Sequence, residues 1–218
     1  MKIRSVEYAG TIVDPDAPLP GELPQLAFAG RSNVGKSSLI NTLLRRTRKK
    51  MARVSAQPGK TRAVNFFRVN DRFFLVDLPG YGYARVPDAV RDQWAHLVEG
   101  YLSRPDGPQA VVQLVDARHD PTKSDRQMLS YLASLKLPAL VILTKIDKLT
   151  HSERIKRLRE LPGDLALEPE QVIPFSSKTG EGREELLASI EALLEGIEQD
   201  APQRGIGGIP LTGGGATP

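Results

Sequence analysis

Residues 30–37 read GRSNVGKS, and no other stretch limits the possible folds of the chain as strongly. The pattern is G-x-x-x-x-G-K-S, and it stands between an apolar run, QLAFAG at 25–30, and SSLINTLL at 37–44, whose apolar residues recur at helical spacing. A strand, such a loop and a helix in succession form a cradle for phosphate oxygens. A chance glycine turn before a helix is the weaker alternative. The sequence therefore predicts a nucleoside triphosphate site, and at this point ATPases, kinases and GTPases all remain open.

Each residue type in this loop has a chemical reason. Gly30 and Gly35 let backbone N–H groups turn inward around the phosphates, where the positive end of the following helix also acts. Lys36 would bridge the outer phosphates and take part in catalysis, and the Ser37 hydroxyl would bind magnesium. The other residues expected at the phosphates are Arg31, Ser32, Asn33, Val34 and Ser38.

Apolar segments separated mostly by helical segments predict an α/β fold in three layers, a six-stranded, mainly parallel sheet with helices on both faces. The expected strands are 25–30, 63–69, 72–77, 110–116, 139–144 and 171–175, with a hairpin turn at Asn70-Asp71. We expect residues 1–22 to be an irregular lead-in, residues 23–200 to form the nucleotide-binding domain, and the glycine- and proline-rich residues 201–218 to be a disordered tail.

Composition excludes several classes of function. The 218 residues include no cysteine, so disulfides, thiolate catalysis and cysteine-bound metals are excluded, and three scattered histidines argue against a zinc site. The chain has no apolar run of about 18 residues and starts without a long apolar segment, which favours a soluble cytoplasmic protein without a membrane partner. The net charge of +4 permits an anionic partner. A monomer is the default expectation.

Two loops indicate which base is bound. TKID, Thr144 to Asp147, directly follows the apolar run ALVIL. The Asp147 carboxylate can accept from the ring N–H and the exocyclic amine of guanine, whereas adenine would leave it unpaired. Lys145 would lay its stem along the base. Thr144 stands where asparagine is commoner, which puts in question its role in tethering the loops.

The second base loop is FSSKTG, residues 175–180, which follows a short apolar run. Ser176 and Ser177 are expected beside the guanine carbonyl, with the Ser177 N–H as donor, and Lys178 would cover the other face of the base. Because two such loops follow a phosphate loop in the right order, the sequence predicts GTP and GDP as ligands.

Two further elements would respond to the terminal phosphate. In DLPG, Asp77 would hold magnesium and the Gly80 N–H would contact that phosphate. The polar stretch 47–64 is long for a loop in a compact domain, which is typical of a functional segment. In it, Gly59 and Thr61 are the expected contacts, and Thr61 is preferred over Thr47 as the hydroxyl that closes on magnesium. The expected magnesium ligands are thus Ser37, Thr61 and Asp77.

With these elements in place, the chain closely resembles the EngB (YihA/YsxC) family of bacterial ribosome-assembly GTPases. The resemblance runs from about Leu23 to Ile197 and depends on AFAGRSNVGKSSLIN, PGKTRAVNFF, DLPGYGYA, LVDARHDPT and TKIDKL. DLPGYGYA and DARHDPT are the most specific of these motifs. The resemblance implies GTP hydrolysis coupled to late maturation of the large ribosomal subunit, with precursor 50S particles and rRNA as partners and a link to cell division and septation.

Tyr81 occupies the position at which many GTPases carry a water-orienting glutamine. A phenol is a poor base at neutral pH, so intrinsic hydrolysis is expected to be slow. Asn33 offers one answer, because in related GTPases with GxxNxGKS loops an asparagine here binds a potassium ion that lies against the phosphates. Activation by the ribosomal particle is the alternative, and a cap on a turn is the purely structural role for Asn33. The expected catalytic residues are Lys36, Thr61, Gly80 and, through potassium, Asn33.

A basic cluster follows the first helix and consists of Arg45, Arg46, Arg48, Lys49, Lys50 and Arg53. We expect it to contact rRNA phosphates, with a solvated surface as the alternative. A second group on the helix after TKID, and Arg85, are expected to be solvated charges, and His119 a turn residue. Three functions stay open: a GTP-hydrolysing assembly switch, a GTP-dependent RNA or protein binding module with incidental hydrolysis, and, more remotely, a P-loop kinase.

Overall fold

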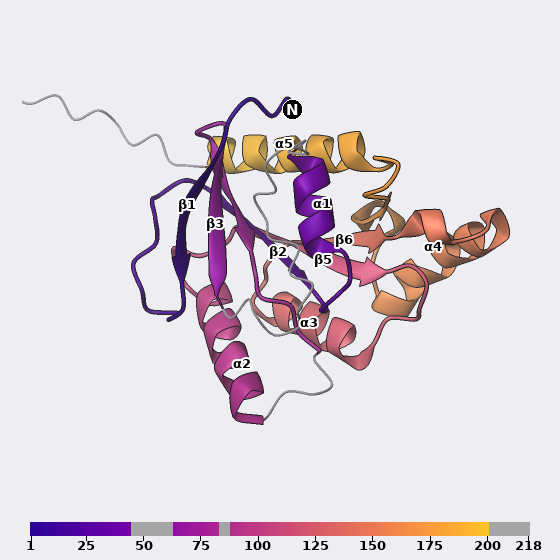
Figure 1. Ribbon diagram of the computed structural model, residues 1–218, viewed down its shortest axis with the longest axis horizontal. Helices are drawn as coiled ribbons and strands as arrows, with labels where there is room; N and C mark the ends of the chain where they lie inside the picture. Colours follow the sequence, from indigo (N-terminus) through magenta and orange to yellow (C-terminus); the bar gives the residue numbers. More distant parts are fainter. Residues whose placement is uncertain (45–62, 83–87, 201–218) are drawn as a thin grey trace, which may run out of the picture.

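The computed structural model describes residues 1–44, 63–82 and 88–200, which form an α/β structure with helices above and below one sheet (Figure 1). The predicted tail at 201–218 lies outside these residues. The strands are β1 (Val6–Ile12), β2 (Gln25–Gly30), β3 (Val64–Val69), β4 (Phe73–Asp77), β5 (Ala110–Asp116), β6 (Ala139–Thr144) and β7 (Val172–Phe175). The helices are α1 (Lys36–Leu43), α2 (Asp88–Leu102), α3 (Lys123–Ser134), α4 (His151–Leu165) and α5 (Arg183–Asp200), with short 3-10 turns at Ile146–Lys148 and Pro169–Gln171.

The described strands form one sheet in the order β1-β3-β4-β2-β5-β6-β7. The neighbouring strands β4, β2, β5, β6 and β7 run parallel to one another, whereas β1 and β4 both pair antiparallel with β3. The chain leaves β2 toward β3 and β4 on one side and later returns to β5 on the other, so the strand order reverses beside β2. In open parallel sheets, ligands bind at the carboxyl ends of the strands where this reversal occurs.

One expectation about the sheet is wrong: it has seven strands, not six, and the additional strand lies in the segment expected to be irregular. β1 is the edge strand and pairs with β3 from Val6 opposite Val69 to Ile12 opposite Val64, with a bulge between Tyr8 and Gly10. Only its two ends are buried, so the sequence lacks the apolar alternation that identifies a strand. Pairing with β3, rather than local propensity, defines this strand.

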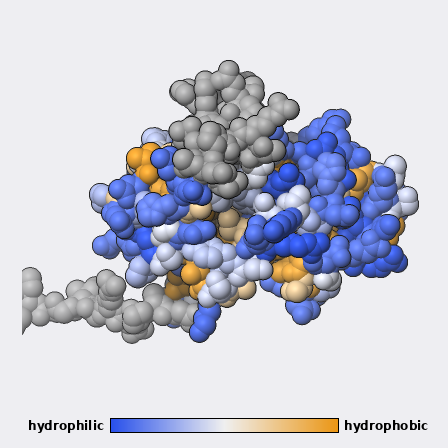
Figure 2. All heavy atoms as spheres, turned by 90° about the horizontal axis from the view of Figure 1, so that it is seen from below, coloured by the Kyte–Doolittle hydropathy of each residue, from blue (hydrophilic) through white to orange (hydrophobic). Residues whose placement is uncertain are grey.

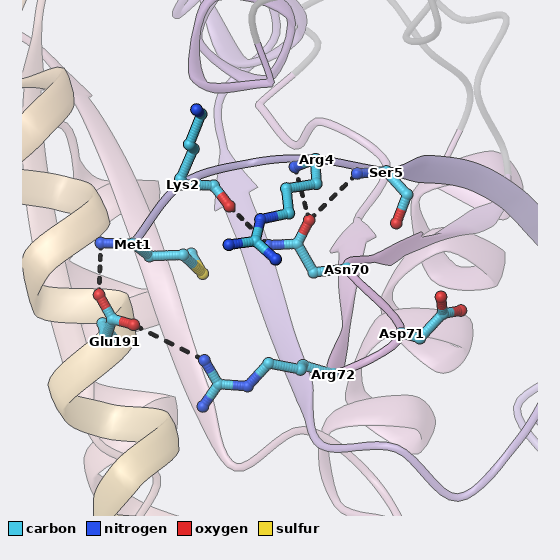
Figure 3. A pocket seen from close by; sticks show the side chains of 8 residues that line it. All are labelled: Met1, Lys2, Arg4, Ser5, Asn70, Asp71, Arg72 and Glu191. Atoms are coloured by element: carbon cyan, nitrogen blue, oxygen red, sulfur yellow. Dashed lines mark hydrogen bonds and ion pairs between the residues drawn. The ribbon is translucent and has the colours of Figure 1, made fainter.

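The turn between β3 and β4 fastens this N-terminal segment. Asn70 and Asp71 both have φ of +53°, the left-handed pair that a tight hairpin turn requires, which confirms the predicted turn. The Asn70 side chain accepts from the N–H groups of Arg4 (2.7 Å) and Ser5 (3.1 Å) and donates to the Lys2 carbonyl (2.8 Å), as Figure 3 shows. A polar pocket of about 440 Å³ lies here, at the amino end of β4 and thus away from the phosphate loop.

Helices α1 and α5 pack on one face of the sheet, and α2, α3 and α4 pack on the other (Figure 1). Leu39, Ile40 and Leu43 of α1 pack with Leu186, Leu187 and Ile190 of α5 in one core cluster. Leu97, Val98 and Tyr101 of α2 pack with Met128 and Leu132 of α3 against the opposite face, and Leu161 of α4 continues that layer. The three-layer arrangement is as predicted. Since alternate residues of a strand face opposite sides, Gln113 of β5 points toward α2 and α3.

The surface is largely polar. The face in Figure 2 is mostly hydrophilic, with hydrophobic residues in small patches. In the described part of the chain, the large hydrophobic residues that are exposed are Tyr8, Val13 and Ile155. None of the helices described is sufficiently long and apolar to cross a membrane.

Candidate functional site

The carboxyl ends of β2, β4, β5 and β6 bring the predicted site residues to one edge of the sheet. In the strand registers Phe28 pairs with Asp77, Gly30 with Leu114, and Asp116 with Thr144. The phosphate loop leaves β2 at this edge, beside the point where the strand order reverses. Segments far apart in sequence therefore meet around the loop at 30–37.

The phosphate loop has the backbone shape that its sequence predicts. Gly35, at the N-cap of α1, has φ of +108°, a conformation that residues with a side chain rarely adopt. Its position carries no side-chain cap, and the first turn of α1 contains no acidic residue. The first N–H groups of α1 have no partner within the helix, so this end of α1 can donate to an anion.

Lys36 and Asp77 form an ion pair in which the lysine ammonium donates to Asp77 Oδ1. Both side chains are about nine-tenths buried. A lysine and a carboxylate so placed are the groups that would act on the outer phosphates and on a metal ion. If a magnesium nucleotide binds here, the ion pair has to open, so that Lys36 can contact a phosphate and Asp77 can contact the metal ion.

Thr144 ties the base loop to the phosphate loop. Its hydroxyl is buried, lies 2.8 Å from the Val34 carbonyl and 3.1 Å from the Val115 carbonyl, and donates between them. The sequence left this tethering role in question because asparagine is commoner here. The hydrogen bond to Val34 shows that threonine performs it.

Lys145 lies across the phosphate loop and is held at its end. Its φ is +60°, its Cε lies 3.8 Å from an ideal Cβ position on Gly35, and its ammonium donates to the Asn33 carbonyl (2.6 Å) and Asp116 Oδ2 (2.8 Å). Arg118 in turn donates to both oxygens of Asp116, at 2.9 and 2.8 Å. Burial raises the pKa of Asp116, but the hydrogen bonds from Arg118 and Lys145 outweigh it and hold that pKa well below its usual range. Asp116 therefore stays charged and holds the lysine stem in place.

Asp147 is oriented by the second base loop. The hydroxyl of Ser176, which is fully buried, donates to Asp147 Oδ1 at 2.7 Å and accepts from the N–H groups of Lys178 and Thr179, both at 3.2 Å. Ser177 and Lys178 themselves are exposed. The two loops predicted to read guanine are thus joined directly, and the Ser176 hydroxyl fixes the carboxylate that would recognise the base.

Tyr81 does not face the phosphate loop with its side chain. It is 5% exposed, and its hydroxyl donates to Asp125 Oδ1 of α3 at 2.9 Å. Its backbone, in contrast, pairs with the phosphate loop, because the Ser32 N–H donates to the Tyr81 carbonyl at 2.9 Å. The phenol is therefore not placed to orient a water molecule at the phosphates.

Several predictions fall outside the described residues. These are Gly59 and Thr61, the basic cluster at 45–53, and Arg85. His119 is exposed in the turn after β5, where its N–H donates to the Asp116 carbonyl at 3.3 Å, in keeping with the turn role. On α4, Lys156 and Arg159 are exposed as expected, whereas Arg154 and Arg157 are partly buried and pair with Glu181 and Asp120.

Three residues around the site were missed by the sequence reasoning. Asp116 had a usable signal, because it ends an apolar parallel strand as Asp77 and Thr144 do. Asp125 and Gln113 had none, since one reads as an ordinary helix-start carboxylate and the other as the single polar residue of a buried strand.

The comparisons with known proteins agree with this geometry. The family described as 50S ribosome-binding GTPase matches residues 25–145. A probable GTP-binding protein EngB from Gemmatimonas aurantiaca is 50% identical over 195 residues, 89% of this chain and 95% of the relative, and one from Desulforamulus reducens is 45% identical over 196 residues, 89% and 95% of the two chains. A crystal structure of a probable GTP-binding protein engB matches with a TM-score of 0.67 and 25% identity, over 79% of this chain and 99% of that one. This chain is therefore a member of the EngB family of GTP-binding proteins, GTPases of the 50S ribosome-binding family.

Proposed function

We propose that the protein is a GTP-hydrolysing switch that assists late assembly of the bacterial large (50S) ribosomal subunit, with any effect on cell division and septation arising through that assembly. The observation that carries the proposal is the match to the 50S ribosome-binding GTPases, because it spans the phosphate loop, Asp77 and the start of the TKID loop. GTP hydrolysis would change the protein from its GTP-bound to its GDP-bound state, and that change would act on the ribosomal partner. We propose the cytoplasm as its location.

The nucleotide would lie along the carboxyl edge of the sheet. Its guanine would contact Asp147, the stem of Lys145 and the backbone of Ser177, while Lys178 covers the outer face. Its phosphates would be cradled by the loop N–H groups and the start of α1. The full proposed set is Gly30, Arg31, Ser32, Asn33, Val34, Gly35, Lys36, Ser37, Ser38, Gly59, Thr61, Asp77, Gly80, Thr144, Lys145, Asp147, Ser176, Ser177 and Lys178.

Magnesium suits the oxygen donors at the phosphate end. Asp77 is buried with its carboxylate directed at Lys36, and Ser37 follows that lysine in α1. A carboxylate and a hydroxyl are hard oxygen ligands of the kind that Mg²⁺ prefers, together with phosphate oxygens and water. Ser37 and Asp77 would hold the ion, with Thr61 as a third ligand when GTP is bound. The ion would neutralise charge that develops on the phosphates.

A potassium ion is the second candidate cofactor. Asn33 is exposed and has φ of +64°, and its backbone carbonyl accepts from Lys145, which leaves the side-chain amide for another ligand. Since the Tyr81 phenol is turned into the core, it does not assist hydrolysis at the phosphates. Another group has to stabilise the negative charge that develops there. Potassium bound by Asn33 would do so from within the protein, and the ribosomal particle would do so from outside.

The orientation of Tyr81 also favours a second candidate function. A protein without a water-orienting group at this position can use GTP to order a binding surface and hydrolyse it only incidentally. In both functions we propose that the basic cluster at 45–53 contacts rRNA phosphates, so that RNA binding and the nucleotide-responsive loop share one segment.

The test is GTP turnover by the purified protein at fixed ionic strength, in potassium and in sodium, each with and without precursor large subunits. The assembly switch predicts multiple turnover that the particle stimulates. Stimulation by potassium alone would assign the missing charge to Asn33, and stimulation by neither would favour the binding module. Lys36→Met should abolish turnover, whereas Lys123→Met, at an exposed lysine on α3, should leave it unchanged.

A further inference from the structure

The side chain of Tyr81 is fixed by a buried polar network. Its hydroxyl donates to Asp125 Oδ1 at 2.9 Å and accepts from the Gln113 side-chain amide. Asp125 is 3% exposed and Gln113 is fully buried. Burial raises the pKa of the Tyr81 phenol well above its ordinary value, and the charge of Asp125 raises it further, so the hydroxyl keeps its proton. The phenol therefore remains a donor to Asp125 over the whole working pH range.

Asp125 is itself held in place by the start of α3. Its second oxygen, Oδ2, accepts from the Thr122 N–H at 2.8 Å and from the Thr122 hydroxyl at 2.7 Å. This is a capping box, which satisfies backbone groups at the helix start. Displacing Tyr81 would therefore leave a buried carboxylate short of a donor, which costs more than the hydrogen bond itself contributes.

Both neighbours of Gly80 are fixed as a result. Before it, the Pro79 carbonyl accepts from the Trp94 indole N–H of α2 at 3.0 Å, and the Trp94 ring packs edge-on against Tyr81 at 5.8 Å. After it, the Tyr81 N–H donates to the Gly30 carbonyl at 3.3 Å, and the Tyr81 carbonyl accepts from Ser32. The backbone of Gly80 is thus clamped between the phosphate loop and the α2/α3 layer.

Gly80 lies so close to the phosphate loop that only glycine fits without displacement. A Cβ atom on Gly80 would lie 3.1 Å from Ser32 Oγ and 3.2 Å from the Ser32 nitrogen. Ser32 Oγ is itself buried and has no hydrogen-bond partner among the described residues. A shift of Gly80 by a fraction of an ångström would consequently alter how its N–H group lies against a phosphate in the loop.

Stability alone does not account for this network. A phenylalanine at residue 81 with apolar partners would fill the same space without three polar groups to satisfy, and such replacements are often neutral or stabilising. Moreover, Gln113 Oε1 is buried without a hydrogen-bond partner in the part of the chain that the structure describes, which is a cost. The polar groups hold one geometry at the expense of stability.

We propose that Tyr81 is a positioning residue that, through Asp125 and Gln113, sets the Gly80 N–H against the phosphate loop and so determines how tightly the protein binds GTP relative to GDP. The residue at the glutamine position thus acts on nucleotide discrimination instead of on the attacking water. The inference rests on the proposed contact of Gly80 with the terminal phosphate. It does not depend on any ribosomal partner.

The test compares Tyr81→Phe with Tyr101→Phe in the full-length protein. Tyr101 is a matched control: its hydroxyl is buried in the same core cluster and donates to Gln25 Oε1 at 2.8 Å, at the opposite end of β2 from the phosphate loop. We expect Tyr81→Phe to raise the Kd for a non-hydrolysable GTP analogue more than twofold and up to about tenfold, because the loss of one hydrogen bond to a charged group sets the upper limit of the effect. The Kd for GDP should change less than twofold, and Tyr101→Phe should change neither by more than twofold.

A double-mutant cycle tests whether Tyr81 acts through Asp125. In an Asp125→Ala background, Tyr81→Phe should weaken GTP analogue binding by less than twofold, because the acceptor of the Tyr81 hydroxyl is already removed. If Tyr81→Phe fails to fold, Gln113→Met keeps the volume, removes the amide donor and should cause a smaller loss in the same direction. Equal weakening of both nucleotides, no weakening of either, or a selective loss in Tyr101→Phe would each overturn the proposal. The measurement uses isolated protein, so a failure to act on ribosomal particles would leave its result standing.

Discussion

Replacing Asp116 with asparagine should weaken the binding of GDP and GTP equally. The Asp116 carboxylate lies 2.8 Å from the Lys145 ammonium, and the side chains are 14% and 25% exposed. An asparagine at residue 116 has the same shape but no charge and one acceptor oxygen instead of two, so Lys145 would lose its ion pair and keep the Asn33 carbonyl, 2.6 Å away, as its main partner. The lysine stem, which we propose to cover the base, would then be free to leave it.

The magnitude follows from the ordering of the lysine. The hydrogen bond between Asp116 and Lys145 is present without nucleotide, so its loss changes the Kd only by releasing the lysine side chain. Immobilising a lysine side chain costs up to about 2 kcal/mol, which the nucleotide would have to offset once Asp116 no longer holds the stem. A net loss of about 1–2 kcal/mol corresponds to a Kd roughly 5 to 30 times higher.

Fluorescence titration with labelled GDP and with a non-hydrolysable GTP analogue measures this directly. Asp120→Asn is the matched control, because Asp120 lies in the same segment but pairs with Arg157 at the surface and is 82% exposed. It should leave both affinities within twofold of the unmodified protein. A Kd for Asp116→Asn within twofold of that value, or a loss confined to one nucleotide, would refute the reasoning.

Three further predictions concern the base, the water and pH. Asp147→Asn should shift preference from guanine to xanthine nucleotides by at least tenfold, because an amide can donate to the xanthine carbonyl that replaces the guanine amine; competition titration with XDP and GDP measures it. Tyr81→Gln should not accelerate GTP hydrolysis, since residue 81 faces Asp125 and not the phosphates; a faster single-turnover rate would contradict that orientation. The folded pKa of Asp116 is lowered, so its contribution to stability should be complete above about pH 4, the unfolded carboxyl value, and be lost as the pH falls through the folded pKa. The difference in unfolding free energy between the unmodified protein and Asp116→Asn should therefore be constant from pH 7 to about 4 and shrink below it.

Six of the seven strands and the positions of the loops that follow them could be predicted, because each of these strands has a local sequence signal. Buried parallel strands are near-continuous apolar runs, and each functional loop starts where one of them ends, as at Gly30, Asp77 and Thr144. The loops meet because parallel strands share one carboxyl edge, so their order along the chain was sufficient. No local signal identified β1, whose exposed middle and bulge make sense only beside β3.

The orientation of side chains within the site could not be predicted. Tyr81 follows Gly80 and would face the phosphates if only the local sequence counted. Its hydroxyl instead bonds to Asp125, 44 residues later, and to Gln113, 32 residues later, which are brought together by the packing of α3 on β5. Which partner the Tyr81 hydroxyl finds at such sequence separations depends on the register of the folded sheet. A short motif therefore does not reveal it.

The segment from Asp116 to Asp125, which begins with DARHDPT at residues 116–122, connects two parts of the candidate site. Its first carboxylate holds Lys145, which we propose to contact the base, and its last holds Tyr81 beside the residue proposed to contact the terminal phosphate. Between them, the Arg118 contacts with Asp116 and the Thr122 capping box fix the turn at both ends. To maintain both contacts, this connection must keep a fixed length and shape between its two points of attachment. Substitutions that alter its geometry, even where they touch no nucleotide, would therefore disturb base binding and phosphate discrimination together, while substitutions at either end disturb only one.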